Sequence, residues 1–153
     1  MIKPVKYDLG KYRQFGKIYQ GENKYHLGHD FNVHLGEEVF SIADGQVLEI
    51  REASGFGGWS PTRKGWYIWI QHDKICALYG HCKPFQIKIG DNIKEGQLIG
   101  HIHDYIRDRF SLPHLHFGIW NGLNYPSHNL GYDKLLKQWI DPKKYIRDYN
   151  ERS

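Results

Sequence analysis

The sequence is poor in the residues that anchor a protein in a membrane or hold a disulfide scaffold together. Of its 153 residues only two are cysteines, Cys76 and Cys82, and only one is methionine. Two cysteines cannot form a disulfide framework, and we expect two free, partly buried thiols rather than a bridge. No apolar run approaches the roughly 20 residues of a transmembrane helix, so no membrane insertion is predicted.

A strong surplus of charge is also missing. Lys and Arg number 21 and Asp and Glu 17, which leaves a net charge of +4. This surplus is too small to indicate a nucleic-acid partner, and no nucleic-acid-binding motif supports one. The N-terminal stretch lacks the apolar centre of a signal peptide, so the sequence does not indicate an export route.

Glycine and aromatic residues, in contrast, are abundant, with 17 and 23 residues respectively. Glycine-containing turns separate short runs of β-branched and aromatic residues, such as GWYIWIQH at 65–72 and HLHFGIW at 114–120. Such runs are typical of strands. Helical crossovers of 10–15 residues do not alternate with them, which argues against a βαβ architecture. The predicted fold class is all-β or β-dominated.

Several local signals predict how these strands are joined. Asp44-Gly45 lies between two apolar runs and predicts a β-hairpin. Further glycine-bounded turns are expected at Gly90-Asp91 and at Glu95-Gly96, each flanked by short strands.

Two helical segments are expected, both near the C-terminal end. Residues 125–139 predict a loop followed by a short helix. Asp141 as N-cap and Pro142 at the first helical position predict a final capped helix.

Ten histidines are the most informative feature. His26 and Asp30 form a His-x-Gly-x-Asp pattern, and residues four apart share a face on a strand. Imidazole and carboxylate ligands suit Zn²⁺, although the same spacing also fits a surface ion pair.

Two His-x-His pairs follow, His101/His103 and His114/His116, and on a strand each pair would point to one face. His81 ends an apolar strand and is placed to reach the mouth of a groove. Spacing alone therefore allows a zinc site without choosing its ligands. The remaining histidines are expected to be surface or structural residues: His29, His34, His72 and His128.

Taken together and in order, six stretches resemble the lysostaphin-type or LytM-like zinc endopeptidases, which cleave peptide bonds in bacterial peptidoglycan. They are HLGHDFN (26–32), ADGQV (43–47), GWYIWIQH (65–72), LYGH (78–81), IKIGDNIKEGQLIG (87–100) and PHLHFGI (113–119). The resemblance implies a single metallopeptidase domain over 1–153 with its core at about 15–146. It also implies a central antiparallel sheet, a small second sheet that forms an open groove with it, and a short C-terminal helix.

Carried over by position, the family pattern makes His26, Asp30 and His116 the ligands of one Zn²⁺ ion. His114 corresponds to the general base, and His81 to its partner, which orients water or stabilises the oxyanion. The resemblance thus implies an enzyme, a zinc-dependent endopeptidase with a peptidoglycan peptide as its substrate and an extracytoplasmic site of action. It selects His114/His116 over His101/His103.

One stretch departs from the family pattern. Relatives usually approach the PHLHF motif through a loop rich in Gly, Ser and Thr, whereas residues 103–113 here read HDYIRDRFSLP. Glycyl-glycine specificity is therefore not expected to carry over. Four aromatic residues are candidates to line the groove: Tyr25, Trp59, Trp66 and Trp120.

Two other functions remain as alternatives. A non-catalytic module on the same fold could activate a partner cell-wall hydrolase, although all five site positions are occupied by suitable residues. Residues 87–100 also resemble the turn-rich repeat of lipoyl and biotinyl carriers, but Lys94 lacks the Met-flanked hairpin tip of a carrier lysine.

Overall fold

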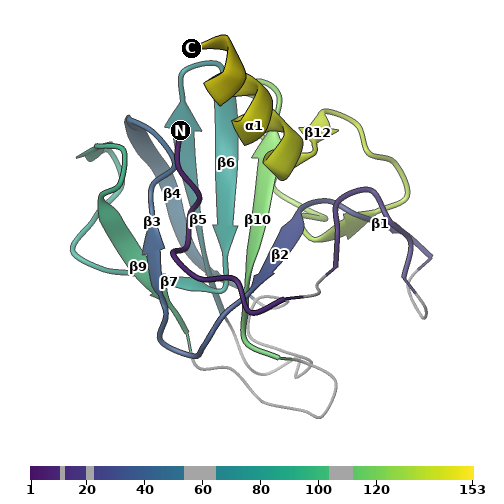
Figure 1. The fold of residues 1–153 in the computed structure, drawn as a ribbon, viewed down its shortest axis with the longest axis horizontal. Helices are drawn as coiled ribbons and strands as arrows, with labels where there is room; N and C mark the ends of the chain where they lie inside the picture. Colours follow the sequence, from purple (N-terminus) through teal and green to yellow (C-terminus); the bar gives the residue numbers. More distant parts are fainter. Residues whose placement is uncertain (11–12, 20–22, 54–64, 104–111) are drawn as a thin grey trace.

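A computed structural model describes residues 1–10, 13–19, 23–53, 65–103 and 112–153. In these residues the chain forms twelve strands and one helix (Figure 1). The strands are β1 Tyr25–His26, β2 His29–Asn32, β3 Glu38–Phe40, β4 Gly45–Ala53, β5 Gly65–His72, β6 Ile75–Gly80, β7 Cys82–Pro84, β8 Asn92–Ile93, β9 Leu98–Ile102, β10 His114–Trp120, β11 Tyr132–Asp133 and β12 Trp139–Ile140. The helix is α1 Pro142–Arg152.

The strands pair only antiparallel within the described residues. The large sheet runs in the order β12-β10-β6-β5-β4-β8, and β2 also pairs with β10. A three-stranded sheet runs β3-β9-β7, and β1 pairs with β11. The β-dominated fold class, with a central antiparallel sheet, a small second sheet and a C-terminal helix, is therefore confirmed.

The large sheet is buried on both faces. On β5, Ile68 and Ile70 belong to one apolar core, whereas Tyr67 and Trp69 belong to another on the opposite face. This follows from the strand geometry, because successive side chains point to opposite faces. Aromatic residues thus supply the second core, in which Trp69 stacks on Trp139 at 5.8 Å between ring centroids.

The C-terminal helix begins where the sequence predicts. The Asp141 carboxylate accepts hydrogen bonds from the backbone N–H groups of Lys143 at 3.0 Å and Lys144 at 3.3 Å. Pro142 occupies the first turn, and Ile146 is buried in the core. The helix thus docks near the end of the sheet where β5 turns into β6 (Figure 1).

The hairpin predicted at Asp44-Gly45 is wrong. β3 pairs with β9 and β4 pairs with β5 and β8, so the chain crosses here from the small sheet to the large one. Gly45 is needed for close packing instead, because a Cβ there would lie 2.3 Å from the Gln71 carbonyl oxygen. The Asp44 carboxylate accepts a hydrogen bond from the Glu95 N–H at 2.8 Å.

The short helix expected within 125–139 is also absent, and all these residues are described. The segment instead forms β11 and leads into β12. Leu130 is buried while Leu135 is 64% exposed, so the segment has no continuous apolar helix face. Lys137 has a left-handed φ of 50°, which is incompatible with an α-helix.

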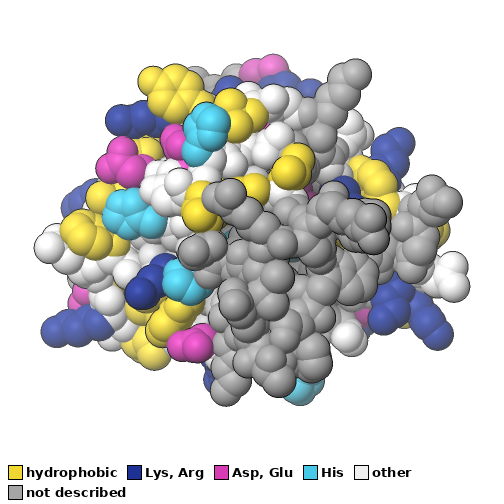
Figure 2. Space-filling view, turned by 90° about the horizontal axis from the view of Figure 1, so that it is seen from below, with side chains coloured by type: hydrophobic (Ala, Val, Ile, Leu, Met, Phe, Trp, Pro, Cys, Tyr) yellow, Lys and Arg dark blue, Asp and Glu magenta, His cyan; other side chains and the backbone are white. Residues whose placement is uncertain are grey.

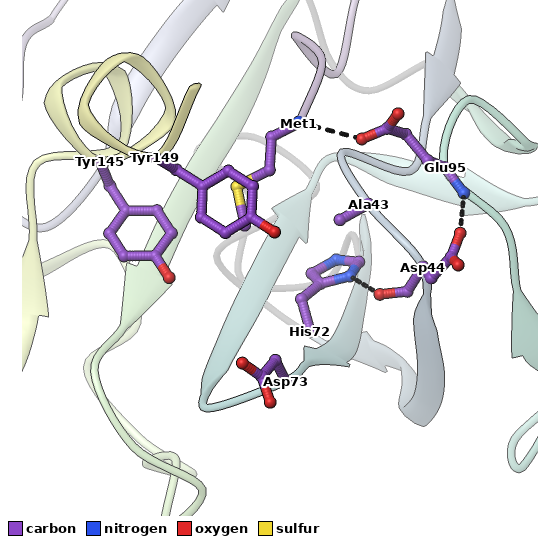
Figure 3. Close-up of a pocket in the computed structure, with 8 residues that line it drawn as sticks. All are labelled: Met1, Ala43, Asp44, His72, Asp73, Glu95, Tyr145 and Tyr149. Atoms are coloured by element: carbon purple, nitrogen blue, oxygen red, sulfur yellow. Dashed lines mark hydrogen bonds and ion pairs between the residues drawn. The ribbon is translucent and has the colours of Figure 1, made fainter. Parts of the chain in front are cut away.

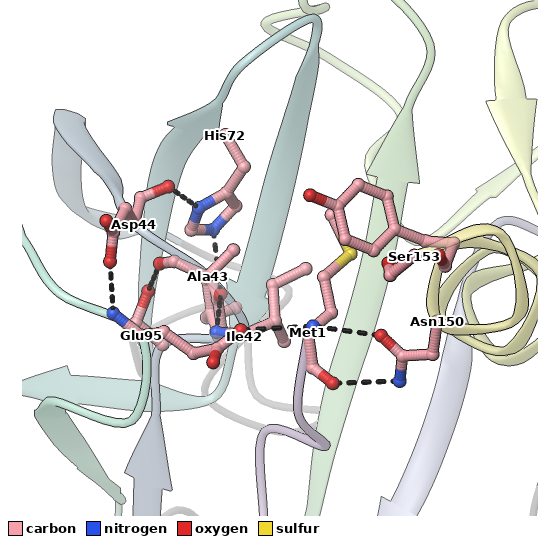
Figure 4. Close-up of polar contacts among 11 residues, drawn as sticks. Met1, Ile42, Ala43, Asp44, His72, Glu95, Asn150 and Ser153 are labelled. Carbon is pink, nitrogen blue, oxygen red and sulfur yellow. Dashed lines mark hydrogen bonds and ion pairs between the residues drawn. The ribbon is translucent and has the colours of Figure 1, made fainter.

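A pocket of about 370 Å³ lies near α1 (Figure 3). Its wall includes His72, whose Nδ1 donates to the Asp44 carbonyl oxygen at 2.9 Å and whose Nε2 lies 3.0 Å from the Tyr79 hydroxyl. Figure 4 shows this network beside the Met1 amine, which donates to the Asn150 side chain at 2.9 Å. His72 is therefore a buried structural residue, as predicted.

Both cysteines are free and fully buried, as the sequence predicts. Burial raises the pKa of the Cys76 thiol to about 11, which leaves it protonated and unreactive. Among the described residues, no helix is both long and apolar enough to cross a membrane.

Candidate metal centre

The pairing of β2 with β10 brings the key residues to one face of the large sheet. His116 lies directly opposite Asp30, and His114 lies opposite Asn32. Because residues two apart on a strand share a face, His114 and His116 point the same way. On the other side of β10, His116 pairs with Gly80, the residue that precedes His81.

Gly28 lets β1 and β2 approach β10 closely. A Cβ at this position would lie 2.5 Å from the Phe117 carbonyl oxygen and 3.0 Å from His116 Cε1. Neither contact could be relieved without moving the strand. The glycine of the His-x-Gly-x-Asp pattern therefore has a packing role, which is to place His26 and Asp30 beside His116.

Three ligand atoms converge at this point. Asp30 Oδ1 lies 3.2 Å from His26 Nε2 and 3.0 Å from His116 Nδ1. The residues are only 1%, 4% and 3% exposed for His26, Asp30 and His116. Within the described ranges, no other group of three or more His, Cys, Asp or Glu side chains is close enough to hold a metal ion.

The tautomer of His26 suits a metal ligand. Its Nδ1 lies 3.2 Å from the Gln14 carbonyl oxygen. A carbonyl cannot donate, so Nδ1 carries the proton and Nε2 directs its lone pair at Asp30 Oδ1. Backbone contacts of this kind commonly orient metal-binding imidazoles. Two acceptor atoms at 3.2 Å repel each other unless a proton or a cation lies between them.

The electrostatics favour a charged carboxylate beside neutral imidazole. Burial alone would raise the pKa of the Asp30 carboxyl, but the three surrounding imidazoles outweigh burial and hold that pKa well below its ordinary value. Burial lowers the pKa of His116, in spite of its hydrogen bond to Asp30. An anionic oxygen and two imidazole nitrogens form a donor set of the kind that binds Zn²⁺.

The spacing of the donor atoms fits the same ion. Tetrahedral zinc with ligand bonds of about 2.0–2.1 Å separates neighbouring ligand atoms by about 3.3 Å. The separations of 3.2 and 3.0 Å are close to this value. His26, Asp30 and His116 therefore fit a zinc ion with little rearrangement.

His114 and His81 lie next to this cluster. The His114 Nδ1 donates to the Leu112 carbonyl oxygen at 2.8 Å, which leaves the lone pair on Nε2. That Nε2 lies 3.8 Å from Asp30 Oδ2, on the side of the cluster. The rings of His81 and His114 meet edge to face with centroids 4.4 Å apart.

The backbone of His81 is unusual, with a left-handed φ of 63°. This conformation costs an L-residue about 1–2 kcal/mol, and such strain concentrates at functional sites. It occurs where the chain leaves β6 and enters β7, and it turns a residue that is only 7% exposed toward His114.

The other histidine pair does not join the cluster. His101 lies on β9, opposite Glu38 and Lys83 on the neighbouring strands, and its ring packs against Phe85 at 5.3 Å. His103 follows the end of β9 and is partly exposed. Figure 2 shows histidine side chains at the surface of the face seen from below the strands of Figure 1.

The predicted groove aromatics and loop have mixed outcomes. Trp120 is buried in the core against Trp139, so it does not line a groove. Tyr25 packs against the same core from a partly buried position. Trp59 and most of the atypical stretch 103–113 lie outside the described residues.

The sequence patterns missed the residues around His26. The Tyr132 ring lies 5.0 Å from the His26 ring, and the Arg13 guanidinium donates to the Tyr132 hydroxyl. Tyr19 meets His26 edge to face at 6.2 Å. These residues belong to no motif, and only the aromatic richness of residues 1–25 indicated that this segment packs somewhere.

Comparison with known proteins gives a consistent result. The family model described as peptidase family M23 matches residues 24–128. Glycyl-glycine endopeptidase ALE-1 of Staphylococcus capitis is 33% identical over 94 residues, which cover 60% of this chain and 24% of that protein. Peptidoglycan DD-endopeptidase ShyB of Vibrio cholerae is 30% identical over 95 residues, covering 61% and 20%. The chain thus spans about a fifth to a quarter of the length of these relatives.

A solved structure agrees on the fold. Lysostaphin from Staphylococcus simulans superposes with a TM-score of 0.67 at 24% identity, over 91% of this chain and 50% of that one. At this identity the similarity supports the fold alone. The antiparallel sheets and the strands that carry the histidines thus follow an architecture already known.

Proposed function

The chain belongs to peptidase family M23, and from this membership we propose that it is a zinc-dependent endopeptidase that hydrolyses peptide bonds in bacterial peptidoglycan. One observation carries the proposal: three buried ligand atoms converge beside a histidine whose Nε2 is free of its own proton. Relatives named as a glycyl-glycine endopeptidase and a peptidoglycan DD-endopeptidase support the substrate.

His26, Asp30 and His116 would hold the zinc ion through Nε2, Oδ1 and Nδ1, the atoms that converge. When bound, zinc acts as a Lewis acid that polarises the scissile carbonyl and makes water acidic enough to be deprotonated near neutral pH. Gln14 contributes by fixing the His26 tautomer, so that the Nε2 lone pair always faces the ion.

His114 is suited to move the proton. Its Nδ1–H is engaged with the Leu112 carbonyl, so Nε2 is the basic nitrogen and points toward the cluster. We assign it as the general base that takes a proton from the attacking water and then passes it to the leaving amine. A positioned base of this type contributes roughly 10²–10⁴-fold to the rate.

His81 supports the charge that develops on the carbonyl oxygen. Its ring lies against His114 and cannot rotate freely, because it is almost fully buried. A fixed N–H donor loses less free energy to reorganisation than a mobile one, and such donors stabilise oxyanions effectively. We assign His81 as an oxyanion-stabilising or water-orienting residue.

We further propose that residues 1–153 form one metallopeptidase domain and that it acts outside the cytoplasm, where peptidoglycan lies. The atypical stretch 103–113 leaves the cleaved bond to be established for this chain.

A peptidoglycan digest tests the proposed function. Purified peptidoglycan is incubated with the protein and zinc, with and without a chelator, and mass spectrometry detects new peptide termini. New termini that vanish with chelator and return with added zinc are the expected result. A non-catalytic module that activates a partner hydrolase would produce no new termini from several wall types.

A further inference from the structure

A cationic side chain lies beside the proposed zinc ligands. The Arg13 carbonyl oxygen accepts a hydrogen bond from the Asp30 N–H at 3.0 Å. Its guanidinium Nη1 donates to the hydroxyl of Tyr132, which pairs with His26 between β1 and β11. Arg13 is thus connected to Asp30 through its backbone and to His26 through Tyr132.

Two aromatic rings hold the guanidinium in place. The Arg13 Cζ lies 5.2 Å from the centroid of the Tyr19 ring and 5.7 Å from that of Tyr132. Both distances are within the range of cation–π attraction. Tyr19 and Tyr132 are only partly exposed, as is Arg13 itself. A planar, weakly hydrated cation fixed in this way is prepared to bind an anion at low entropic cost.

The segment that carries Arg13 runs beside the metal-binding strands. Gly16 N–H donates to the His26 carbonyl at 2.8 Å, and His26 N–H donates to the Lys17 carbonyl at 2.9 Å. Residues 13–19 therefore line the edge of the site next to His26. The arginine is part of this edge and is not on a remote surface.

We propose that Arg13, held by Tyr19 and Tyr132, binds a carboxylate of the peptide substrate close to the scissile bond, so that the enzyme prefers peptides with a free carboxylate there. This inference rests on the proposed function and names a feature of its substrate. A guanidinium presents its N–H donors in a planar fork that matches a carboxylate.

The distances set the reach of this subsite. The Arg13 Cζ is 5.7 Å from the Tyr132 centroid, and that centroid is 5.0 Å from the His26 ring. An extended peptide spans about 3.3–3.6 Å per residue. A carboxylate bound by Arg13 would therefore belong to a residue within about three positions of the cleaved bond.

A purely structural role for Arg13, in which it only fastens residues 13–19 to β11, makes a different prediction. In that case the identity of the substrate's acidic groups would not matter. Replacing Arg13 would then weaken cleavage of charged and uncharged peptides equally.

The test uses soluble cross-linked peptides released from peptidoglycan, before and after their carboxylates are converted to carboxamides with a carbodiimide and ammonia. Amidation should lower kcat/KM of the unaltered protein roughly ten- to a hundredfold, as expected for losing a hydrogen-bonded charge pair. Most of that change should appear in KM. Arg13→Met should cleave both peptide pools at the same low kcat/KM while still binding zinc.

Arg13→Lys, which keeps the charge without the fork, should retain part of the preference. Arg147→Met serves as the matched control, because Arg147 lies on α1 and its guanidinium contacts Asp148. Equal cleavage of both pools by the unaltered protein, or a full preference in Arg13→Met, would overturn the inference and leave the proposed function intact. Failure of the zinc-loaded protein to cleave either pool would reject the proposed function, and the inference with it.

Discussion

His116 and Asp30 face each other directly across two neighbouring antiparallel strands, with Nδ1 and Oδ1 3.0 Å apart. They are 86 residues apart in the chain. A shift of one residue in the register of β2 against β10 would turn Asp30 to the opposite face. The candidate metal centre is therefore a direct consequence of strand register, and changes that disturb this register should disturb metal binding.

Gly28→Ala should weaken zinc binding without removing any ligand. The added Cβ would lie 2.5 Å from the Phe117 carbonyl oxygen, so β2 must move away from β10. Overpacking of this kind costs about 1–3 kcal/mol of stability. We expect zinc affinity to fall roughly ten- to a hundredfold, as it does when a residue supporting a ligand is lost. Competition with a calibrated chelator measures this affinity.

Gly131→Ala is the control for that variant. A Cβ at Gly131 meets nothing within 4 Å, although the Gly131 carbonyl accepts a hydrogen bond from Leu27 N–H beside the site. It should keep both zinc affinity and stability. Equal zinc affinity in the two variants would show that close strand approach at Gly28 is unimportant.

His81→Gly and His81→Ala should separate backbone strain from chemistry. Glycine adopts the φ of 63° without strain, so His81→Gly should be more stable than His81→Ala by about 1 kcal/mol. Both variants should lose most of the peptidase activity because both lack the imidazole. Denaturant unfolding and cleavage assays measure the two effects.

Similar stabilities for these two variants would argue against strain at position 81. Retained cleavage in His81→Gly would mean that the side chain has no part in the reaction.

His72 should make the folded state sensitive to acid. Burial lowers the pKa of His72, against the opposing effect of its hydrogen bond to the Asp44 carbonyl. Below the unperturbed pKa of about 6.5 the unfolded chain binds a proton at His72 that the folded chain does not. The free energy of unfolding should therefore fall as the pH drops below about 6.5, and this loss should be absent at higher pH.

Thermal unfolding at about pH 7.5 and pH 5.5 tests the contribution of His72. His72→Gln should show a smaller decrease in Tm between these values than the unaltered protein. Burial also lowers the pKa values of His29 and His116, but both proteins share those residues. An identical decrease in Tm would exclude His72 as a source of the acid sensitivity.

The sequence predicted those features that depend on local chemistry. Asp141 and Pro142 located the helix, and the run at 65–72 located a buried strand. The His-x-Gly-x-Asp and His-x-His patterns supplied candidate ligands, but a family resemblance was needed to choose His114/His116 over His101/His103. Both pairs have the same spacing, and only their strand neighbours differ.

Features that depend on distant contacts escaped prediction. Asp44-Gly45 has the composition of a hairpin turn, yet the glycine is required by the approach of the Gln71 carbonyl, which no local pattern indicates. Arg13 and Tyr132 meet only because β1 pairs with β11. The αL backbone of His81 likewise follows from the connection between β6 and β7 and not from a turn motif.

The most direct test of the account measures bound zinc and peptidoglycan cleavage on the same samples of the unaltered protein, His114→Ala and His116→Ala. The unaltered protein should bind one zinc ion per chain and cleave. His114→Ala should keep its zinc and lose roughly 10²–10⁴-fold in turnover, whereas His116→Ala should lose both zinc and activity. Undiminished cleavage by His114→Ala, or undiminished zinc binding by His116→Ala, would contradict the assignment of the site.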